Sequence, residues 1–497
     1  MSIPTTIMEL EITPVELETQ KGPISTTVTI IETSKSTTLS EHYSQREKNI
    51  WRKVLDVKEA KKQASISVPM VITNLSYYLI TLVSVIFASR FGALELAGST
   101  LANSWATVTG LALTTGLSGA LETLCGQAYG ANIHRMLGIY LQSSTIISFI
   151  FSVVASISWF FSEPILIFLH QDHQVAKVAS SYLKCLIPGL FAYGFLQCIL
   201  RFLQTQSVVK PLILCSLVPL GIHIGLTYLL VHCTPLGFKG APLAAGLSLW
   251  LSVLMLALYL KYSVKFKHTL EGLSMESIHH LLPNIRLAIS SAVMVCLEFG
   301  VFELLVLLAG LMPNSETSTA LIALCVITET VSYMIISGLS AAVSTRVSNE
   351  IGAGNINHAK KAMIVTAKLS VILALTISLS LIVAHNLWAS LFSNSSLLKD
   401  EFASITPLLA ISMLLDSAQG ILSGVARGCG WQHLGALTNF AAFYIVGTPI
   451  SVVLGFKVGL QTKGLWIGLI CGLCFQCCIL LLITFCSKWT QLKLSEH

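Results

Sequence analysis

Charged residues are scarce in this chain of 497 residues: Asp, Glu, Lys and Arg make up 11% of it, whereas 54% of the residues are hydrophobic. This composition argues against a water-soluble protein, because so few charged side chains do not cover a solvated surface of that size. The formal net charge of +6 does not indicate a nucleic-acid partner, since the basic residues are spread over loops and one tail and form no stripe. We therefore expect no nucleic-acid partner, and a lipid bilayer as the main surroundings of the chain.

Motifs for metal binding, ATP use and catalysis are also missing. Residues 471–478 contain two overlapping CxxC patterns, but no histidine or separate CxxC accompanies them, and most of the 13 cysteines fall in apolar runs, where packing explains them. No Gly-Lys-Ser/Thr follows a glycine-rich stretch, so no phosphate-binding loop is indicated. An enzyme would need a nucleophile with a base or a His-rich cluster, whereas the histidines are scattered, with one pair at His279-His280. We expect no cofactor, no bound metal and no enzymatic activity.

Long apolar runs are what the chain has in abundance. About 20 apolar residues cross roughly 30 Å of hydrocarbon as a helix. The sequence contains twelve such runs, which predict an all-α polytopic membrane protein. The predicted spans are approximately residues 66–89, 101–124, 138–161, 180–203, 211–232, 240–260, 287–311, 319–341, 362–385, 403–426, 434–456 and 464–486.

One stretch of the sequence occurs twice. The segment that begins Gly116-Leu117-Ser118 is echoed by the segment that begins Gly338-Leu339-Ser340, 222 residues later. Other spans correspond at the same offset, so each half contains six spans. Because six is even, the two halves share one orientation in the membrane. Parallel repeats of this kind form two lobes related by a pseudo-two-fold axis along the membrane normal, with a binding cavity between them.

The even number of spans places both termini on one side of the membrane. Most of the 30 Lys and Arg residues lie in the tails and in loops on the tails' side, which identifies that side as the cytosol. Residues 46–62 suit either a short helix on the cytosolic leaflet or a solvated linker, and Asn394 begins a glycosylation sequon in an outward-facing loop. The predicted parts are a disordered cytosolic tail (1–63), an N-terminal six-helix lobe (64–262), a cytosolic inter-lobe loop (263–286), a C-terminal six-helix lobe (287–487) and a cytosolic C-terminal tail (488–497).

Acidic residues within the spans are distributed unequally between the two halves. Glu298, Glu303, Glu329 and Asp416 all face uncharged residues of the first half in the repeat alignment, whereas the first half has Glu122 near the end of its second span. A charged side chain at the centre of a membrane helix costs about 2.5 to 3.5 kcal/mol, so acids retained there suggest a function. We therefore predict that proton chemistry resides in the C-terminal half.

Glu298 and Asp416 are the preferred proton-coupling residues, with Glu303 as a further candidate. Burial favours the neutral form of a carboxylic acid, so such a group exchanges a proton near physiological pH and reports the acidity of the side it faces. Glu303 lies five residues after Glu298, about 140° around the helix, and we favour Glu298 for the lumen because it is nearer the helix middle. The alternative is that each acid is tied structurally to a neighbouring hydroxyl or backbone group.

Residue types and positions suggest candidates for a substrate cavity and for structural contacts. Aromatic side chains on the first, seventh and eighth spans suit the walls of a substrate cavity, although packing or lipid contact would also explain them, and Asn74 offers either a cavity hydrogen bond or a helix contact. These cavity candidates are Asn74, Tyr77, Tyr78, Phe299, Phe302 and Tyr333. Arg346 and Glu350 have the spacing of a helical ion pair. The structural candidates in the repeated motif are Gly126, Gln127, Gly130, Arg346, Glu350 and Gly352.

Three motifs at the predicted membrane edges resemble a known family. Residues 125–131 (CGQAYGA), 344–355 (STRVSNEIGAGN) and 423–432 (SGVARGCGWQ) are similar to plant members of the multidrug and toxic compound extrusion (MATE) family. The resemblance covers approximately residues 55–487. It implies twelve helices in two V-shaped lobes and the export of organic compounds in exchange for protons.

The resemblance also implies roles for two of the acids. An acid within Cys-Leu-Glu of the seventh helix and an Asp of the tenth are linked to proton binding in plant members, and they match Cys296-Leu297-Glu298 and Leu415-Asp416-Ser417. The chain departs from the family at Ser290-Ser291, where Pro-Ser is usual, and at Phe299, where Trp is common. A missing proline bears on the bending of the seventh helix, and a changed aromatic bears on the shape of the pocket.

The resulting prediction is a proton-coupled antiporter that exports hydrophobic or cationic organic compounds and functions as a monomer. Its partners are a small organic substrate, protons and the bilayer. A vacuolar or a plasma membrane would offer an acidic far side, and no sorting signal selects between them. The alternatives are a twelve-helix transporter of another class, such as a sugar or drug porter, and a membrane scaffold that transports nothing.

Overall fold

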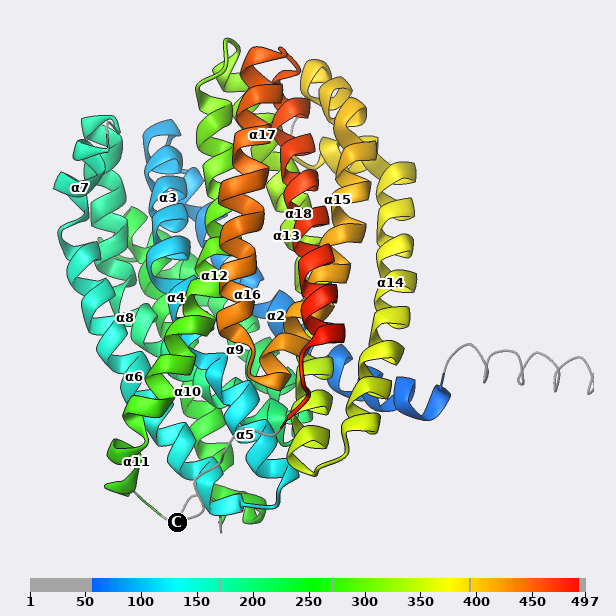
Figure 1. Cartoon of the computed structure of the whole chain (residues 1–497). Coiled ribbons are helices and arrows are strands. Elements are labelled where there is room, and N and C mark those ends of the chain that lie inside the picture. The colour runs from blue at the N-terminus through cyan, green and yellow to red at the C-terminus, as the bar shows by residue number, and fades with distance from the viewer. Residues whose placement is uncertain are drawn as a thin grey trace, which may run out of the picture. The chain divides into compact units, whose positions relative to one another are not determined.

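The computed structural model describes residues 56–169, 171–267, 269, 272, 274–392 and 395–490. Every regular element within these residues is a helix (Figure 1). Helices meet the requirement of a lipid environment because they satisfy their backbone hydrogen bonds internally. Residues 1–55, most of the predicted tail, and Asn394 of the sequon lie outside the described residues, whereas the first helix already begins at Val57.

The elements follow the chain in two comparable series. The N-terminal half contains α2 (Val57–Ser89), α3 (Ala93–Ala106), η1 (Thr107–Leu111), α4 (Ala112–Ser118), α5 (Ala120–Gly130), α6 (His134–Phe160), α7 (Ser162–Phe168), α8 (His173–Thr205), α9 (Lys210–His232), η2 (Gly237–Lys239) and α10 (Gly240–Tyr262). The connection contains η3 (Val264–Phe266) and α11 (Glu276–His279). The C-terminal half contains α12 (Leu281–Gly310), α13 (Ser315–Gly352), α14 (Ile356–Ser390), α15 (Ser396–Cys429), α16 (Gln432–Asn439), η4 (Phe440–Gly447), α17 (Thr448–Val452), η5 (Val453–Lys457) and α18 (Gln461–Cys486).

Eleven helices of the described chain are long and apolar enough to cross a membrane. The predicted span 101–124 is missing from this count because α3, η1, α4 and α5 divide it into shorter pieces, with a π-helical turn at Thr107–Leu111 and a break at Gly119. The corresponding helix of the second half, α13, is continuous over 38 residues. Several helices exceed the roughly 20 residues that hydrocarbon requires. Helix α13 does so because the polar repeat motif continues the helix beyond the predicted span 319–341.

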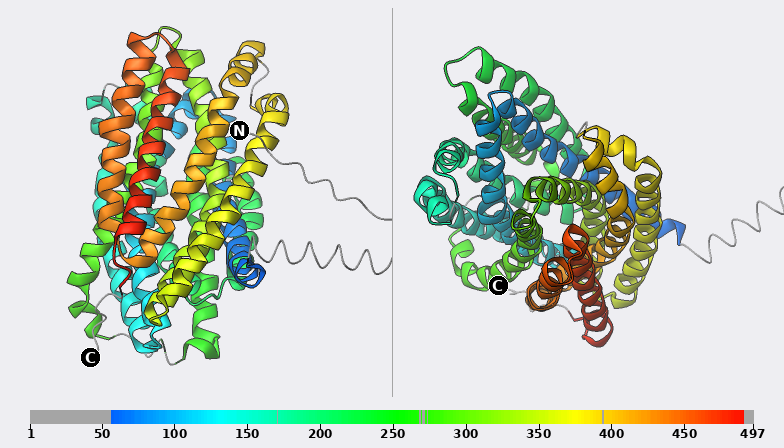
Figure 2. Two further views of the ribbon diagram at one scale, coloured as in Figure 1. Left: turned by 45° about the vertical axis from the view of Figure 1, so that its right-hand side comes forward. Right: turned by 90° about the horizontal axis from the view of Figure 1, so that it is seen from above.

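The internal repeat is visible in the positions at which the helices begin. Helices α3 and α13 begin at Ala93 and Ser315, and α6 and α14 begin at His134 and Ile356, 222 residues apart in both cases. Viewed along the helices, the cyan helices α6–α8 and the yellow-to-red helices α14–α18 lie on opposite sides, whereas blue α2 extends toward the yellow helices (Figure 2). The structure thus consists of two parallel six-span halves, as the repeat predicts.

The first helix of each half packs against the second span of the other half. A Cβ atom at Gly116 of α4 would lie 2.4 Å from the Cα of Ala292 on α12. The equivalent Gly338 of α13 would bring a Cβ atom 2.7 Å from the carbonyl oxygen of Ser67 on α2. Such distances leave no room for a side chain, so the glycines allow backbones of opposite halves to touch.

Contacts between the halves gather at the end of the bundle where α5, α8, α13 and α15 finish, which we call the contact end. A Cβ atom at Gly130 would lie 2.0 Å from the carbonyl oxygen of Asn349, and one at Gly352 would lie 2.1 Å from that of Gln127. These two contacts are equivalent under the repeat. They show a pseudo-two-fold interface between the ends of α5 and α13.

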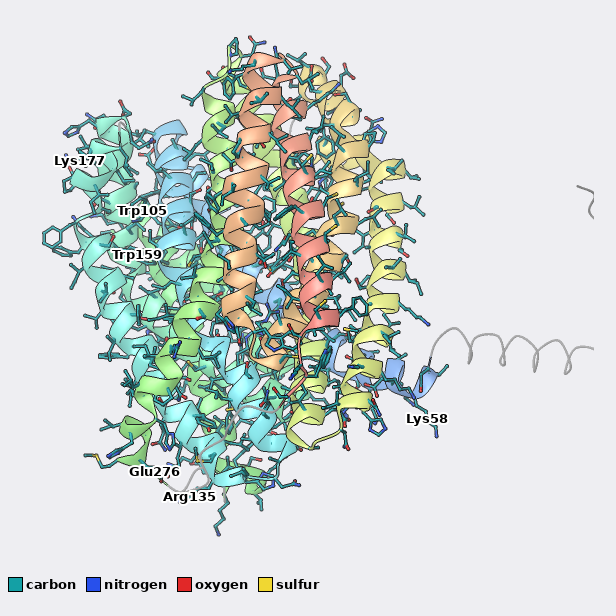
Figure 3. The ribbon with its side chains drawn as sticks, viewed as in Figure 1. Lys58, Trp105, Arg135, Trp159, Lys177 and Glu276 are labelled. Atoms are coloured by element: carbon teal, nitrogen blue, oxygen red, sulfur yellow. The ribbon has the colours of Figure 1, made fainter. Side chains whose placement is uncertain are left out.

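The connection between the halves is attached to the contact end of α6. Arg135 of α6 forms an ion pair with Glu276 of α11, and the two side chains lie beside each other in Figure 3. Gln142 of α6 donates a hydrogen bond to the carbonyl oxygen of Gly272 and accepts one from the backbone N–H of Ser274. This part of the inter-lobe loop is therefore anchored to the N-terminal half.

Candidate functional site

Two buried carboxyl groups meet through one amide side chain. Nε2 of Gln419 on α15 lies 2.9 Å from Oε1 of Glu298 on α12 and 2.9 Å from Oδ1 of Asp416 on α15. The amide donates a hydrogen bond to each acid, so both of its N–H groups are used. We call Glu298 and Asp416 the acid pair. The structure brings together the two residues that the sequence singled out for proton coupling.

The bridging amide is held in its orientation by neighbours on two helices. Its oxygen accepts hydrogen bonds from Ser423 Oγ at 3.0 Å and from Gln476 Nε2 at 3.2 Å. Gln476 of α18 also donates to Oδ1 of Asn439, whose amide donates to the carbonyl oxygen of Met294 on α12. A polar network thus ties α12, α15, α16 and α18 together around the acid pair, and buried networks of this kind specify one arrangement of the groups.

Glu329 is a third buried acid near the pair, on α13. Its Oε2 accepts a hydrogen bond from Ser412 Oγ at 2.8 Å, and Ser412 in turn accepts one from Nε1 of Trp466 at 3.1 Å. Glu329 interacts electrostatically with Asp416. The structure places Glu303 one and a half turns beyond Glu298 on α12, partly exposed and beside Ser104 of α3 rather than in the acid pair.

Gln419 was not singled out as a site residue by the sequence, although one signal was present. The repeat places Gln419 opposite Gln197, so an amide recurs within an apolar span of each half. A glutamine three residues after a predicted proton-binding Asp on the same helix would face the same side. This spacing does not show that Gln419 also contacts Glu298 on α12.

The aromatic candidates fall into two groups. The rings of Phe299 on α12 and Tyr333 on α13 meet edge to face, with centroids 6.1 Å apart, and both side chains are partly exposed. Phe302 is partly buried against the core of the second half. Tyr77, by contrast, is buried in the first half, where its hydroxyl donates to the carbonyl oxygen of Cys215 at 3.4 Å.

Two other cavity candidates lie on α2. Asn74 donates a hydrogen bond to Ser337 Oγ of α13 at 2.8 Å and remains partly exposed. It therefore joins the two halves, which is the helix contact that the sequence left open as an alternative. Tyr78 is partly exposed.

A buried ion cluster lies at the contact end. Oε2 of Glu122 on α5 accepts a hydrogen bond from Nε of Arg427 on α15 at 3.0 Å, and its Oε1 lies 2.9 Å from Nη1 of Arg201 on α8. Glu122 is completely buried. We call Glu122, Arg201 and Arg427 the ion cluster. Neither arginine was assigned a role from the sequence, although each places a charged side chain at the end of an apolar run.

A second ion network at the contact end involves the repeated motif. Nη2 of Arg346 lies 2.7 Å from Oε1 of Glu350, as their spacing on α13 predicts. Arg346 also contacts Glu59 of α2, with Nε 2.9 Å from Oε1. The motif residues Gly126 and Gly352 lie inside helices rather than in turns, and Gly354, with a φ of 75°, provides the left-handed turn that follows α13.

No group of three or more His, Cys, Asp or Glu side chains within the described residues has the arrangement of a metal site. The acid pair and its neighbours consist of carboxyl, amide and hydroxyl groups, which donate and accept hydrogen bonds.

Comparison with known proteins connects this arrangement to transport. The MatE family model matches residues 69–229 and 290–453. Protein DETOXIFICATION 18 of Arabidopsis thaliana is 58% identical over 441 residues, which cover 89% of this chain and 94% of the relative. Protein DETOXIFICATION 16 of the same organism is 43% identical over 433 residues, with 87% and 89% covered.

Solved structures show the same fold. The crystal structure of the eukaryotic MATE transporter AtDTX14 aligns with a TM-score of 0.84 and 37% identity, over 87% of this chain and 97% of that one. A MOP superfamily transporter from Pyrococcus furiosus, 20% identical, aligns with a TM-score of 0.75 over 85% of this chain and 94% of its own.

Proposed function

This chain belongs to the MatE family of membrane transporters, and from that premise we propose that it exports organic compounds from the cytosol in exchange for protons. The observation that carries the proposal is the acid pair, in which Gln419 joins Glu298 and Asp416 in the interior of a multi-pass membrane protein. Acids retained within the membrane are typical of proton relays in transporters. The corresponding positions of the first half, Ser76 and Gly194, carry no charge.

In the proposed cycle, the described state faces away from the cytosol. The contact end is closed by the helix ends of both halves, and the charge distribution of the loops favours the cytosolic side for that end. Protons entering from the far side neutralise the acid pair. Gln419 then faces neutral acids in place of carboxylates, so the hydrogen bonds between α12 and α15 rearrange and substrate is released.

The return step moves the protons into the cytosol. The halves rock, the contact end opens and the acid pair loses its protons, which restores the substrate-binding state. Each pH unit across the membrane supplies about 1.4 kcal/mol per proton, and 100 mV supplies about 2.3 kcal/mol per charge. One or two protons per cycle are enough to concentrate a substrate.

The proposed substrates are hydrophobic compounds with aromatic or cationic groups. The partly exposed rings of Phe299 and Tyr333 present an edge-to-face pair next to the acid pair. Aromatic faces bind flat apolar rings and cations. We further propose that the protein works as a monomer, because the acid pair and both halves are formed by one chain, and that it resides in a vacuolar or plasma membrane with both termini in the cytosol.

The test is substrate flux in proteoliposomes with an imposed pH gradient. We expect gradient-driven uptake by the parent and its loss in Glu298→Gln and Asp416→Asn, which retain the size of each side chain but not its proton exchange. Glu316→Gln is the matched control, because this acid is exposed in the first turn of α13. Parent-like flux in both acid-pair variants would show that coupling lies elsewhere, and absence of flux for all alkaloids, phenolic amides and flavonoid glycosides tested would contradict the export proposal.

A further inference from the structure

The ion cluster at the contact end joins the two halves and contains one negative and two positive side chains. Glu122 and Arg201 belong to the first half and Arg427 belongs to the second, so one carboxylate is shared by two guanidinium groups. Both arginine side chains are largely buried, with 18% and 15% of their surfaces exposed. Removing one partner of a buried ion pair is costly because the remaining charge is left uncompensated.

The cluster is not a product of the duplication. The repeat equivalents of Glu122 and Arg201 are Ser344 and Ser423, neither of which is charged. The glycine contacts of the same interface, by contrast, occur in equivalent pairs. A charged group present in only one repeat points to a role beyond holding the two halves together.

Helix α15 connects the ion cluster with the acid pair along one face. Asp416, Gln419, Ser423 and Arg427 follow one another at intervals of three or four residues, and hydrogen bonds join the first three. Arg427 also donates to Ser340 Oγ at 2.7 Å and interacts electrostatically with Glu298. The acid pair and Arg427 thus lie along one helix, and the charge of Glu298 acts on Arg427.

If the halves separate, the ion cluster divides between Glu122 and Arg427. Arg201 moves with Glu122, because α5 and α8 belong to the same half, whereas Arg427 moves away with α15. Glu122 keeps one cationic partner and stays neutralised. Arg427 keeps its electrostatic interaction with Glu298, which lies on its own half.

We propose that Glu122 is the latch of the contact end, engaged across the halves by Arg427 in the closed state and kept paired by Arg201 in the open state. The proposal deepens the proposed function and rests on it in one respect, namely that the contact end opens during transport. Glu122 is a positioning residue in this role, since it acts on the arrangement of the halves and not on the substrate.

The two arginines should therefore have opposite effects on opening. Arg427→Gln removes the ion pair that Glu122 makes across the halves and leaves Glu122 balanced by Arg201, which favours the open contact end. Arg201→Gln leaves Glu122 balanced by Arg427 in the closed state and unpaired in the open state, which favours the closed contact end. A merely structural cluster would loosen in both variants.

The test is peptide-resolved amide hydrogen exchange of the full chain in lipid nanodiscs, read at residues 120–130 and 339–352. Loss of a charge-assisted hydrogen bond predicts about tenfold faster exchange in Arg427→Gln, whereas Arg201→Gln should exchange more slowly than the parent. Arg135→Gln is the matched control, since this arginine pairs at the surface with 61% of its side chain exposed, and its exchange at both peptides should equal the parent's.

Faster exchange in both cluster variants, or unchanged exchange in both, would overturn the latch. The double variant Arg201→Gln with Arg427→Gln guards against misfolding, because the remaining Glu122 can bind a proton and become neutral, and it should open as readily as Arg427→Gln. Slower exchange in the double variant than in the parent would also overturn the proposal. Exchange is measured without substrate or gradient, so a failure of the export proposal would appear in the flux assay and leave the exchange result interpretable.

Discussion

Gly126 and Ser348 occupy equivalent positions of the two repeats and face each other across the interface between the halves. A Cβ atom on Gly126 would lie 2.0 Å from Ser348 Oγ. Because equivalent residues meet where a two-fold axis passes, the pseudo-two-fold axis runs between α5 and α13 at this point. The repeated motif is therefore the surface on which the halves close.

Gly352→Ala should weaken the closed contact end. The added methyl group would lie 2.1 Å from the carbonyl oxygen of Gln127, and a backbone atom does not move aside as a side chain does. Overpacking costs about 1–3 kcal/mol, so we expect a lower melting temperature in detergent and reduced transport. Gly225→Ala is the control, because no atom lies within 4 Å of a Cβ there; equal melting temperatures for both variants would contradict the close approach.

Gln419→Leu should uncouple the acid pair. The leucine retains the volume of the side chain but donates no hydrogen bond to Glu298 or Asp416, so protonation at one acid no longer reaches the other. We expect loss of gradient-driven flux, measured in proteoliposomes at several pH gradients. Gln197→Leu, the equivalent change in the first half, should retain the gradient response; if the two variants behave alike, the bridge has no special part in coupling.

Glu329→Gln should retain gradient-driven transport. The glutamine oxygen still accepts the hydrogen bond from Ser412 Oγ, which lies 2.8 Å from the carboxylate in the parent, and the acid pair keeps both of its protonation sites. We expect flux within about fivefold of the parent, since a neutral acceptor replaces a charged one at a cost of about 1 kcal/mol. Complete loss of flux, as expected for Glu298→Gln, would mean that Glu329 carries a coupled proton.

Phe299→Ala should weaken substrate binding without altering the response to the gradient. The ring forms an edge-to-face pair with Tyr333, and such pairs contribute about 0.5–1.5 kcal/mol beyond their buried area. We expect the KM for an aromatic substrate to rise by about threefold to tenfold. Phe485→Ala, at a side chain with 75% of its surface exposed, should leave KM unchanged, and an equal rise in both variants would exclude Phe299 from the cavity wall.

Arg135→Ala should have little effect on stability. The ion pair with Glu276 is at the surface, where such pairs contribute about 0–1 kcal/mol. We expect a melting temperature close to that of the parent, and a still smaller difference at high salt, which screens the ion pair in the parent. A large loss would mean that anchoring of the inter-lobe loop to α6 stabilises the fold through Arg135 itself.

The predicted spans agree closely with the helices where one apolar run forms one helix, as in α9 and α10. Span 101–124 differs because hydropathy does not distinguish a straight helix from one divided by a π-helical turn and a glycine break. The polar motif 344–352 lies between the predicted spans 319–341 and 362–385, yet it is helical, and its hydroxyl groups are buried. Composition predicts where a chain enters lipid, but not where polar side chains find partners within the protein.

Apolar run length and the repeat determined the membrane class and the two halves from the sequence alone, and the unequal distribution of acids singled out Glu298 and Asp416 as candidates. Only the tertiary structure decided that Gln419 joins these acids, although it lies 121 residues from Glu298, and that Arg427 meets Glu122 from the other half. The physical reason is that membrane helices are apolar on their lipid-facing and their buried sides alike. Their sequences therefore specify insertion, whereas the rotation of each helix, and with it the partner of every polar side chain, depends on packing against the other helices.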